Sequence, residues 1–137
     1  MTHRVRRVDY FYSTVRNQEG EAYQLLSQLA SLGVSLLAFN AMPTGPLHAQ
    51  LTLFPEDDAY MAGAAGKAGL ILDGPHPALL VQGDDELGAL AGIHEKLFEA
   101  KVSVFSSNGV TDGKGSYGYV LYIRPSDFER AARALGI

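Results

Sequence analysis

Residues 32–40 (LGVSLLAFN) and residues 100–108 (AKVSVFSSN) are the two stretches that decide the fold of this 137-residue chain, because the second repeats the first at an offset of 68 residues. The residues that match at this offset are Gly20 with Gly88, Val34 with Val102, Ser35 with Ser103, and Asn40 with Asn108. Pro55 matches Pro125 at an offset of 70, as do the aspartates two residues further on, which a two-residue difference in one loop would explain. A repeat of this length is too long for a solenoid unit and indicates a small domain duplicated in tandem.

The first half has the pattern of a β-α-β-β-α-β unit. Residues 8–15 are rich in β-branched and aromatic residues that alternate between two faces, which predicts a strand. Apolar residues at helical spacing follow and end at Gly33, which predicts a helix. The remaining predicted elements are strands at 34–41 and 47–54, a helix at 59–68 and a short last strand at 70–72.

The second half repeats this order up to its last strand. The predicted elements are a strand at 78–82, a helix at 87–100, strands at 102–107 and 117–123, and a helix at 126–135. Only two residues follow this helix, so the second copy lacks a counterpart of residues 70–72. That strand normally covers the sheet edge beside the first strand, and an uncovered edge pairs readily with another strand. We expect the gap to be filled by the other copy, by the N-terminal segment or by a second chain.

The boundary between the copies is expected at the Pro- and Gly-rich residues 73–77 (DGPHP), which gives domains at 1–73 and 76–137. Several strands carry apolar residues on both faces, although the predicted helices can cover only one face of each sheet. We therefore expect the copies to pack on each other or on a second subunit, in a homodimer. The strand tyrosines, Tyr117 and Tyr119 among them, are interpreted as core or interface packing.

The composition excludes several classes of function. The chain has no cysteine and a net charge of −4, and its only basic cluster lies near the N-terminus, so nucleic acid is not an expected partner. No apolar stretch reaches the roughly 20 residues of a membrane helix, and no targeting segment is evident, so we expect a cytoplasmic protein without a membrane partner. Four scattered histidines show no metal spacing, and no nucleophile motif is present. We expect no metal, no cofactor and no catalytic residues.

The turn from the first strand into the first helix is the strongest candidate site in both copies. A helix N-terminus offers free backbone N–H groups, and a glycine lets another molecule approach the backbone. The candidate ligand-binding residues of these turns are Asn17, Gln18, Glu19 and Gly20 in the first copy and Asp85, Glu86, Leu87 and Gly88 in the second. The alternative is that the acidic residues only cap their helices.

Asn40 and Asn108 are further candidate ligand-binding residues, because they end matching strands and an amide both donates and accepts hydrogen bonds. An amino acid's amino and carboxylate groups would suit such an amide. The alternative is a turn asparagine with a left-handed backbone, for which the Asn108–Gly109 pair is typical.

The repeat resembles an ACT domain, the regulatory module that binds amino acids in many metabolic enzymes. The resemblance rests on the β-α-β-β-α-β order over nearly the whole chain, on Gly20 and Gly88, and on the two stretches quoted first. It implies an α+β fold of two tandem ferredoxin-like domains, with ligands held by the glycine turn and the facing second strand of a neighbouring copy. The chain departs from the family pattern in two ways. The second copy lacks its last strand, and it carries three consecutive acids at 84–86, which would repel a carboxylate if they pointed inward. They favour the first copy as the ligand site.

Three hypotheses about function follow. The leading one is a free-standing tandem ACT protein, not an enzyme, that binds an amino acid or a similar small metabolite and regulates a separate enzyme. Apolar amino acids would be tested first, because Leu37, Phe39 and Phe105 would suit them. The second is a protein interaction module that uses the open sheet edge. The third is a small ferredoxin-like enzyme, which the lack of an acid, base and nucleophile grouping disfavours.

Overall fold

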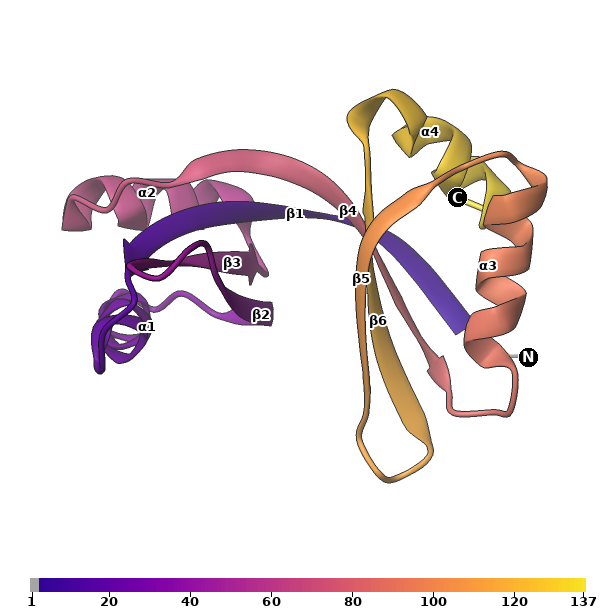
Figure 1. Ribbon diagram of the computed structural model, residues 1–137, viewed down its shortest axis with the longest axis horizontal. Helices are drawn as coiled ribbons and strands as arrows, with labels where there is room; N and C mark the ends of the chain where they lie inside the picture. The colour runs from indigo at the N-terminus through magenta and orange to yellow at the C-terminus, as the bar shows by residue number, and fades with distance from the viewer. Residues whose placement is uncertain (1–2) are drawn as a thin grey trace. The chain divides into compact units, whose positions relative to one another are not determined.

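The computed structural model describes residues 3–137 as an α+β chain of antiparallel strand pairs and helices (Figure 1). The elements are β1 (His3–Arg16), α1 (Glu21–Ser31), β2 (Leu36–Pro43), β3 (His48–Pro55), α2 (Asp58–Ala68), β4 (Asp73–Asp84), α3 (Ala89–Glu99), β5 (Val104–Thr111), β6 (Ser116–Ile123) and α4 (Pro125–Ala134). The α+β class expected from the sequence is confirmed. No helix in the described part is long and apolar enough to cross a membrane.

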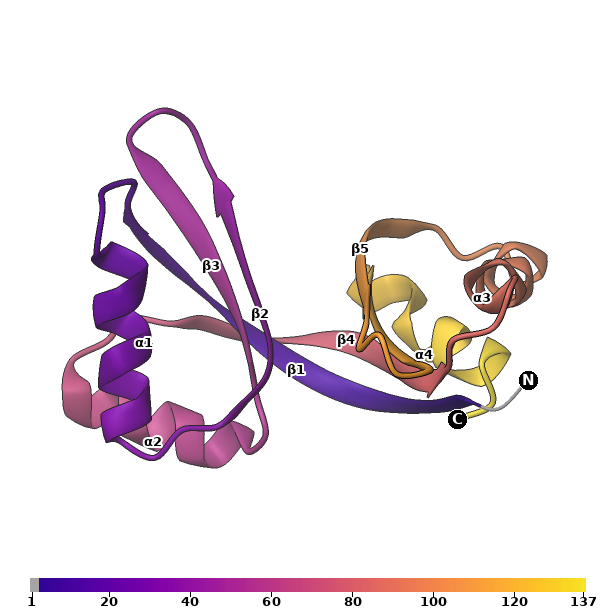
Figure 2. The same ribbon diagram turned by 90° about the horizontal axis from the view of Figure 1, so that it is seen from below.

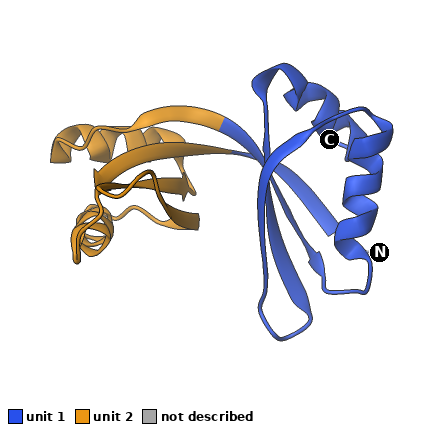
Figure 3. Ribbon diagram, viewed as in Figure 1, with its two compact units in different colours: residues 1–8, 77–137 blue, residues 9–76 orange. Residues whose placement is uncertain are grey.

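The chain divides into two compact units, which Figure 3 distinguishes by colour. Among the described residues, unit 1 consists of 3–8 together with 77–137, and unit 2 consists of 9–76. Three element pairs recur at the offset of 68 that the sequence shows: α1 with α3, β2 with β5, and β3 with β6. The division into domains at 1–73 and 76–137 stays a prediction.

Unit 2 has the strand order β2-β3-β1-β4, to which β1 contributes its second half. Phe11 of β1 lies opposite Leu53 of β3 in an antiparallel pair. The helices α1 and α2 pack on the same face of this sheet (Figure 2), because their apolar stripes share one core with the strands. The buried residues of that core are Phe11, Leu25, Leu29, Leu51, Leu53 and Met61.

Unit 1 has the strand order β1-β4-β6-β5, to which β1 contributes residues 3–8. Leu79 of β4 lies opposite Leu121 of β6, and every second residue of β6 from Tyr117 to Ile123 belongs to the core beneath α3 and α4. These residues face one way, as their alternation in the sequence predicts. The helices contribute Ala89, Ile93, Leu97, Phe128, Ala131 and Ala132 to this core.

The N-terminal segment fills the strand position that the second copy lacks. Val5 is buried in the core of unit 1 with Leu79 and other apolar residues. Arg7 forms an ion pair of 2.6 Å with Glu129 of α4, and its guanidinium carbon lies 5.6 Å from the ring centre of Phe128. Of the three sources expected from the sequence, the N-terminal segment is therefore the one that lies beside β4 in unit 1.

One expectation for the region between the copies is wrong, because residues 70–72 form no strand. Residues 73–77, where the boundary between the copies is expected, begin β4. A Cβ atom on Gly74 would lie 2.8 Å from the carbonyl oxygen of Tyr10, so the start of β4 runs tightly against β1. In unit 2 this part of β4 is the edge strand, where proline is tolerated because one side needs no ladder hydrogen bonds.

The structural equivalence inferred for Pro55 and Pro125 from their offset of 70 residues is also wrong. Pro55 pairs with Leu36 at the end of β3, and the residue in the same register of β6 is Ile123, which pairs with Val104. Pro125 instead opens α4, where the fixed φ angle of proline suits the first helical position. The two prolines therefore share a residue type and not a structural role.

Candidate functional site

The turn before the first helix of each unit has the same backbone hydrogen bonds. In unit 2 the N–H groups of Asn17, Gln18, Glu21 and Gln24 donate to the carbonyl oxygens of Leu47, Arg16, Gln18 and Gly20, respectively. In unit 1 the equivalent N–H groups of Asp85, Glu86, Ala89 and Gly92 donate to those of Gly115, Asp84, Glu86 and Gly88. Gly20 and Gly88 precede their helices with φ angles of 84° and 82°, a left-handed conformation that favours glycine. The backbone of this turn is thus the same in both units.

The side chains on this shared backbone differ sharply in charge. Arg16 of unit 2 forms an ion pair of 3.0 Å with Glu21. The equivalent turn of unit 1 carries three consecutive acids at residues 84–86, and none of them has an ion-pair or side-chain hydrogen-bond partner within residues 3–137. No side chain caps α1 or α3 by a hydrogen bond. The capping alternative therefore has no hydrogen bond to support it in the described structure.

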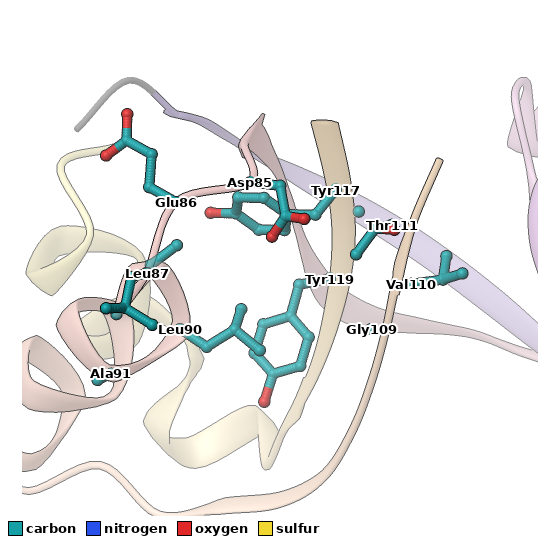
Figure 4. A pocket seen from close by; sticks show the side chains of 13 residues that line it. Asp85, Glu86, Leu87, Leu90, Ala91, Gly109, Val110, Thr111, Tyr117 and Tyr119 are labelled. Carbon is teal, nitrogen blue, oxygen red and sulfur yellow. The ribbon is translucent and has the colours of Figure 1, made fainter. Parts of the chain in front are cut away.

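A cavity of about 740 Å³ opens beside the acidic turn of unit 1 (Figure 4). The turn and the first residues of α3 form one wall, and β5 and β6 form the other. The lining residues are Asp85, Glu86, Leu87, Gly88, Ala89, Leu90, Ala91, Gly109, Val110, Thr111, Tyr117, Gly118 and Tyr119. The volume is within the range of cavities that hold small-molecule ligands.

Tyr119 of β6 is held in place at the floor of this cavity by two hydrogen bonds. Its hydroxyl donates to Ser107 Oγ at 2.9 Å and lies 2.8 Å from His94 Nε2. Gly109 lies opposite it on β5, and a Cβ atom there would come within 2.7 Å of Tyr119 Cδ1. The absence of a side chain at Gly109 is therefore what lets the tyrosine ring lie across the strand pair.

Tyr117 projects into the same cavity from β6, on the side of the acidic turn (Figure 4). The residue is 8% exposed, yet its hydroxyl has no hydrogen-bond partner among residues 3–137. Burial, together with the charges of Asp84 and Glu86, raises the pKa of Tyr117 above its ordinary value of 10.0. The phenol is therefore neutral at physiological pH and keeps both its donor and its acceptor.

The candidate residues from the sequence fall in three places. Asp85, Glu86, Leu87 and Gly88 line the cavity of unit 1 together. Asn108 lies on β5 opposite Val120, directly before Gly109, and does not line the cavity. Asn17, Gln18, Glu19, Gly20 and Asn40 belong to unit 2, where Asn40 of β2 lies opposite Thr52. Ligand binding by these residues stays a prediction in both units.

Sequence reasoning missed the two tyrosines as parts of a site. Tyr117 and Tyr119 do belong to the core, as interpreted, but both also line the cavity. The alternation along β6 already places both on the face covered by the helices, two residues apart and level with the turn. His94 of α3, one of the four histidines without metal spacing, supports Tyr119 through its hydrogen bond.

The equivalent positions of unit 2 carry different residues. Ala49 and Leu51 stand where unit 1 has Tyr117 and Tyr119, and Tyr23 of α1 stands where unit 1 has Ala91. The tyrosine rings that line the cavity therefore have no counterpart at the equivalent strand positions of unit 2. Within the described residues, no group of three or more His, Asp or Glu side chains is placed to hold a metal ion.

Comparison with known proteins gives structural neighbours but no sequence match. No protein-family model and no curated protein matches the chain. The crystal structure of protein BT0572 from Bacteroides thetaiotaomicron is similar with a TM-score of 0.80 at 15% identity, over 96% of this chain and 88% of that one. The ligand-free regulatory subunit of aspartate kinase from Thermus thermophilus is similar with a TM-score of 0.61 at 16% identity, over 96% and 93%.

A third neighbour is the structure of aspartokinase alpha and beta subunits, with a TM-score of 0.59 at 14% identity, over 98% of this chain and 95% of that one. At such low identity these likenesses show the fold alone. The aspartate kinase neighbours include regulatory subunits, whose domains are of the ACT type. The resemblance predicted from the two repeated stretches is therefore confirmed at the level of the fold: the chain has the fold of the ACT-type regulatory domains of aspartate kinase.

Proposed function

We propose that this chain is a tandem ACT-type regulatory protein, without catalytic activity of its own, that binds an amino acid or a similar small metabolite in the cavity of unit 1. The observation that carries the proposal is the meeting of the acidic glycine turn with Tyr117 and Tyr119 around one cavity of about 740 Å³. The likeness to regulatory subunits supports the regulatory role. The choice of unit 1 departs from the sequence argument, which favoured the first copy.

The cavity combines the features that a small-metabolite site needs. Leu87 and Leu90 supply apolar surface, Tyr117 and Thr111 supply hydroxyl groups, and the turn supplies charge. Ligand sites of this size are mostly apolar with a few placed polar groups. Gly88 leaves the backbone open, since a Cβ atom there would meet nothing within 4 Å.

A thermal-shift panel of the common amino acids and simple amines tests the proposal. A ligand that binds only the folded protein stabilises it by roughly 1.4 kcal/mol at ten times its Kd, which raises Tm by a few degrees. We expect at least one compound to give such a rise at millimolar concentration. A panel in which no compound raises Tm would contradict ligand binding by this fold.

A variant that adds bulk at the rim of the cavity locates the site. Ala91→Tyr places in unit 1 the residue that unit 2 carries as Tyr23, which is 73% exposed on α1, so the helix should tolerate it. We expect this variant to fold normally and to lose the ligand-induced rise in Tm. The matched control is Tyr23→Ala in unit 2, which should leave the rise unchanged. Loss of the rise in the control alone would place the site in unit 2.

The proposal includes a homodimer and a separate regulated enzyme. β5 is the edge strand of unit 1, and Phe105 and Val110 on it are 51% and 74% exposed. An exposed strand edge with apolar side chains pairs readily with another chain. Light scattering after size exclusion tests this part: a dimer mass is expected, and a monomer mass at micromolar concentration would contradict it.

A further inference from the structure

We propose that the cavity of unit 1 selects a ligand with a primary ammonium group on an aliphatic chain over a neutral ligand of the same shape. This inference rests on the proposed function and names the ligand class of the same site. It departs from the apolar amino acids that the sequence suggested. The same chemistry occurs in basic amino acids and in carboxylate-free diamines, and the experiment below distinguishes these two sources.

The charge of the cavity is the first argument. Asp85 and Glu86 line it, and none of its lining residues is Lys, Arg or His. Neither carboxylate has an ion-pair partner in the described chain, so both are available to a cation. Figure 4 shows the Glu86 carboxylate pointing away from the cavity, so Glu86 attracts a cation only at longer range. An ammonium group in the cavity could donate a charge-assisted hydrogen bond to Asp85, whereas an anionic group would be repelled.

The unpartnered hydroxyl of Tyr117 is the second and independent argument. The residue is more than nine-tenths buried and lines the cavity, and its hydroxyl has no partner within residues 3–137. The Tyr117 ring is buried, but its hydroxyl oxygen is not among the fully buried atoms without a partner in the described residues, so it is open to the cavity. An ammonium group has three N–H donors and can bond the phenol oxygen as well as the Asp85 carboxylate. This hydroxyl therefore lacks the donor that such a ligand supplies.

The apolar lining accounts for the aliphatic chain. Leu87, Leu90 and Val110 surround the opening, and they are 105%, 40% and 74% exposed. Large apolar side chains this exposed gain stability when a ligand covers them. A chain of methylene groups behind the ammonium group would do so.

The third acid of the turn, Asp84, belongs to a neighbouring hollow of about 430 Å³ and does not line the cavity. Asp84 lines this second hollow together with His3 and Arg4, and Tyr117 separates it from the first. There the positive charge of Arg4 offsets the negative charge of Asp84. The argument for a cation therefore rests on Asp85 and Glu86, which do not line the second hollow.

Calorimetric titration with four probes tests the inference on the full chain. Ornithine and norleucine are matched in shape, since a terminal ammonium group in one replaces a methyl group in the other. Putrescine carries the ammonium groups without a carboxylate, and glutamate carries an added negative charge. We expect ornithine or putrescine to bind roughly fivefold to tenfold tighter than norleucine, because each partly exposed charge pair contributes up to about 1 kcal/mol. Glutamate should bind weakest, and added salt should reduce the preference.

The chain itself supplies the matched variant. Asp85→Asn with Glu86→Gln gives the turn of unit 1 the uncharged Asn-Gln pair that unit 2 carries at residues 17 and 18 on the same backbone. We expect this double variant to bind norleucine as before and to lose the preference for the cation. Tyr117→Phe should weaken cation binding several-fold while leaving norleucine unchanged. Glu56→Gln removes an exposed carboxylate of unit 2 outside the candidate turn, so it is the control and should change neither affinity.

The outcomes separate this inference from the proposed function. Norleucine binding as tightly as both ornithine and putrescine would overturn the inference and leave ligand binding intact. A cation preference that survives Asp85→Asn with Glu86→Gln would overturn it as well, because the selectivity would then come from other residues. Failure of all four probes and of the whole thermal-shift panel would overturn both. Binding of ornithine without putrescine supports a basic amino acid, and the reverse supports a diamine.

Discussion

The two glycine turns of this chain share a backbone but not a chemistry. Four equivalent backbone hydrogen bonds and two left-handed glycines hold residues 16–20 and 84–88 in the same conformation. Yet one turn is balanced in charge by Arg16 and Glu19, and the other carries three acids. Backbone hydrogen bonds and glycine therefore fix the turn in both units, while the side chains are free to determine what each turn can bind.

The comparison extends to the strand that faces each turn. β6 of unit 1 presents Tyr117 and Tyr119, and β3 of unit 2 presents Ala49 and Leu51 at the equivalent positions. All four positions face the helices of their own unit, so the pattern of apolar residues is retained. Of these four residues, Tyr117 adds a free hydroxyl group to the cavity beside the acidic turn, and Tyr119 adds its ring. The two units thus conserve the features that form the core and differ in the features that can form a site.

The largest expected effect comes from the strand that the N-terminal segment adds to unit 1. Val5→Asp places a carboxylate in the apolar core of unit 1 and should lower the free energy of unfolding by about 3 kcal/mol. The equivalent position of unit 2 is Asp73, which is 77% exposed, so Asp73→Val should change it by less than about 0.5 kcal/mol. Urea unfolding of both variants measures the difference. Equal effects would show that the N-terminal strand does not complete unit 1.

Replacing the two turn glycines tests whether the backbones are equivalent. A Cβ atom on Gly20 or Gly88 would meet nothing within 4 Å, so the cost of Gly20→Ala or Gly88→Ala comes from the left-handed backbone alone. We expect each to lower the free energy of unfolding by about 1 kcal/mol. Denaturant unfolding of the two variants should agree within error. A cost at one turn only would mean that the shared conformation is not maintained in solution.

The smallest expected effect is a pH dependence confined to unit 2. A hydrogen bond with the carboxyl of Asp9, burial and the charges of Asp9 and Asp57 raise the pKa of Asp58 to about 6. The ordinary value is 3.8, so the folded state binds more protons than the unfolded state between these values, and stability falls as pH rises from about 4 to about 6.

Asp58→Asn should remove that loss. It should stabilise the protein at pH 7 by up to about 1 kcal/mol, since partial exposure screens the charges, and should have no effect below about pH 4. Thermal unfolding across this range measures it. In unit 1 the residue equivalent to Asp9 is Pro77, so no such pair exists there. An identical pH profile for the variant and the natural chain would contradict the carboxyl pair.

Much of the fold follows from the sequence, because local patterns determine it. The shared helix stripes, the glycines and the alternation of β6 predict the elements and their order. The pairing of residues 3–8 with β4 was only one of three alternatives, because strand pairing depends on which distant segment reaches an open edge. The matching prolines misled because proline suits both a strand end beside a register shift, as at Pro55, and a helix start, as at Pro125.

The site was less predictable than the fold. The sequence identified the acidic turn but took its charge as a reason to favour the other copy. The cavity also depends on the approach of Gly109 to Tyr119 across a strand pair, and on the Tyr117 hydroxyl, which has no partner in the described residues. Both features arise from register and packing, which periodicity does not specify. A pair of tyrosines two residues apart on the helix-covered face was the one signal available.

Mapping the backbone amide chemical shifts on addition of ornithine tests the central claim most directly, since both turns are observed in one experiment. The account predicts changes concentrated at residues 85–91, 109–111 and 117–119, with the equivalent residues 17–23, 41–43 and 49–51 unchanged. The same titration with norleucine should give smaller changes at the same residues. Changes concentrated at residues 17–23 instead would contradict the account, because the ligand would then prefer the uncharged turn.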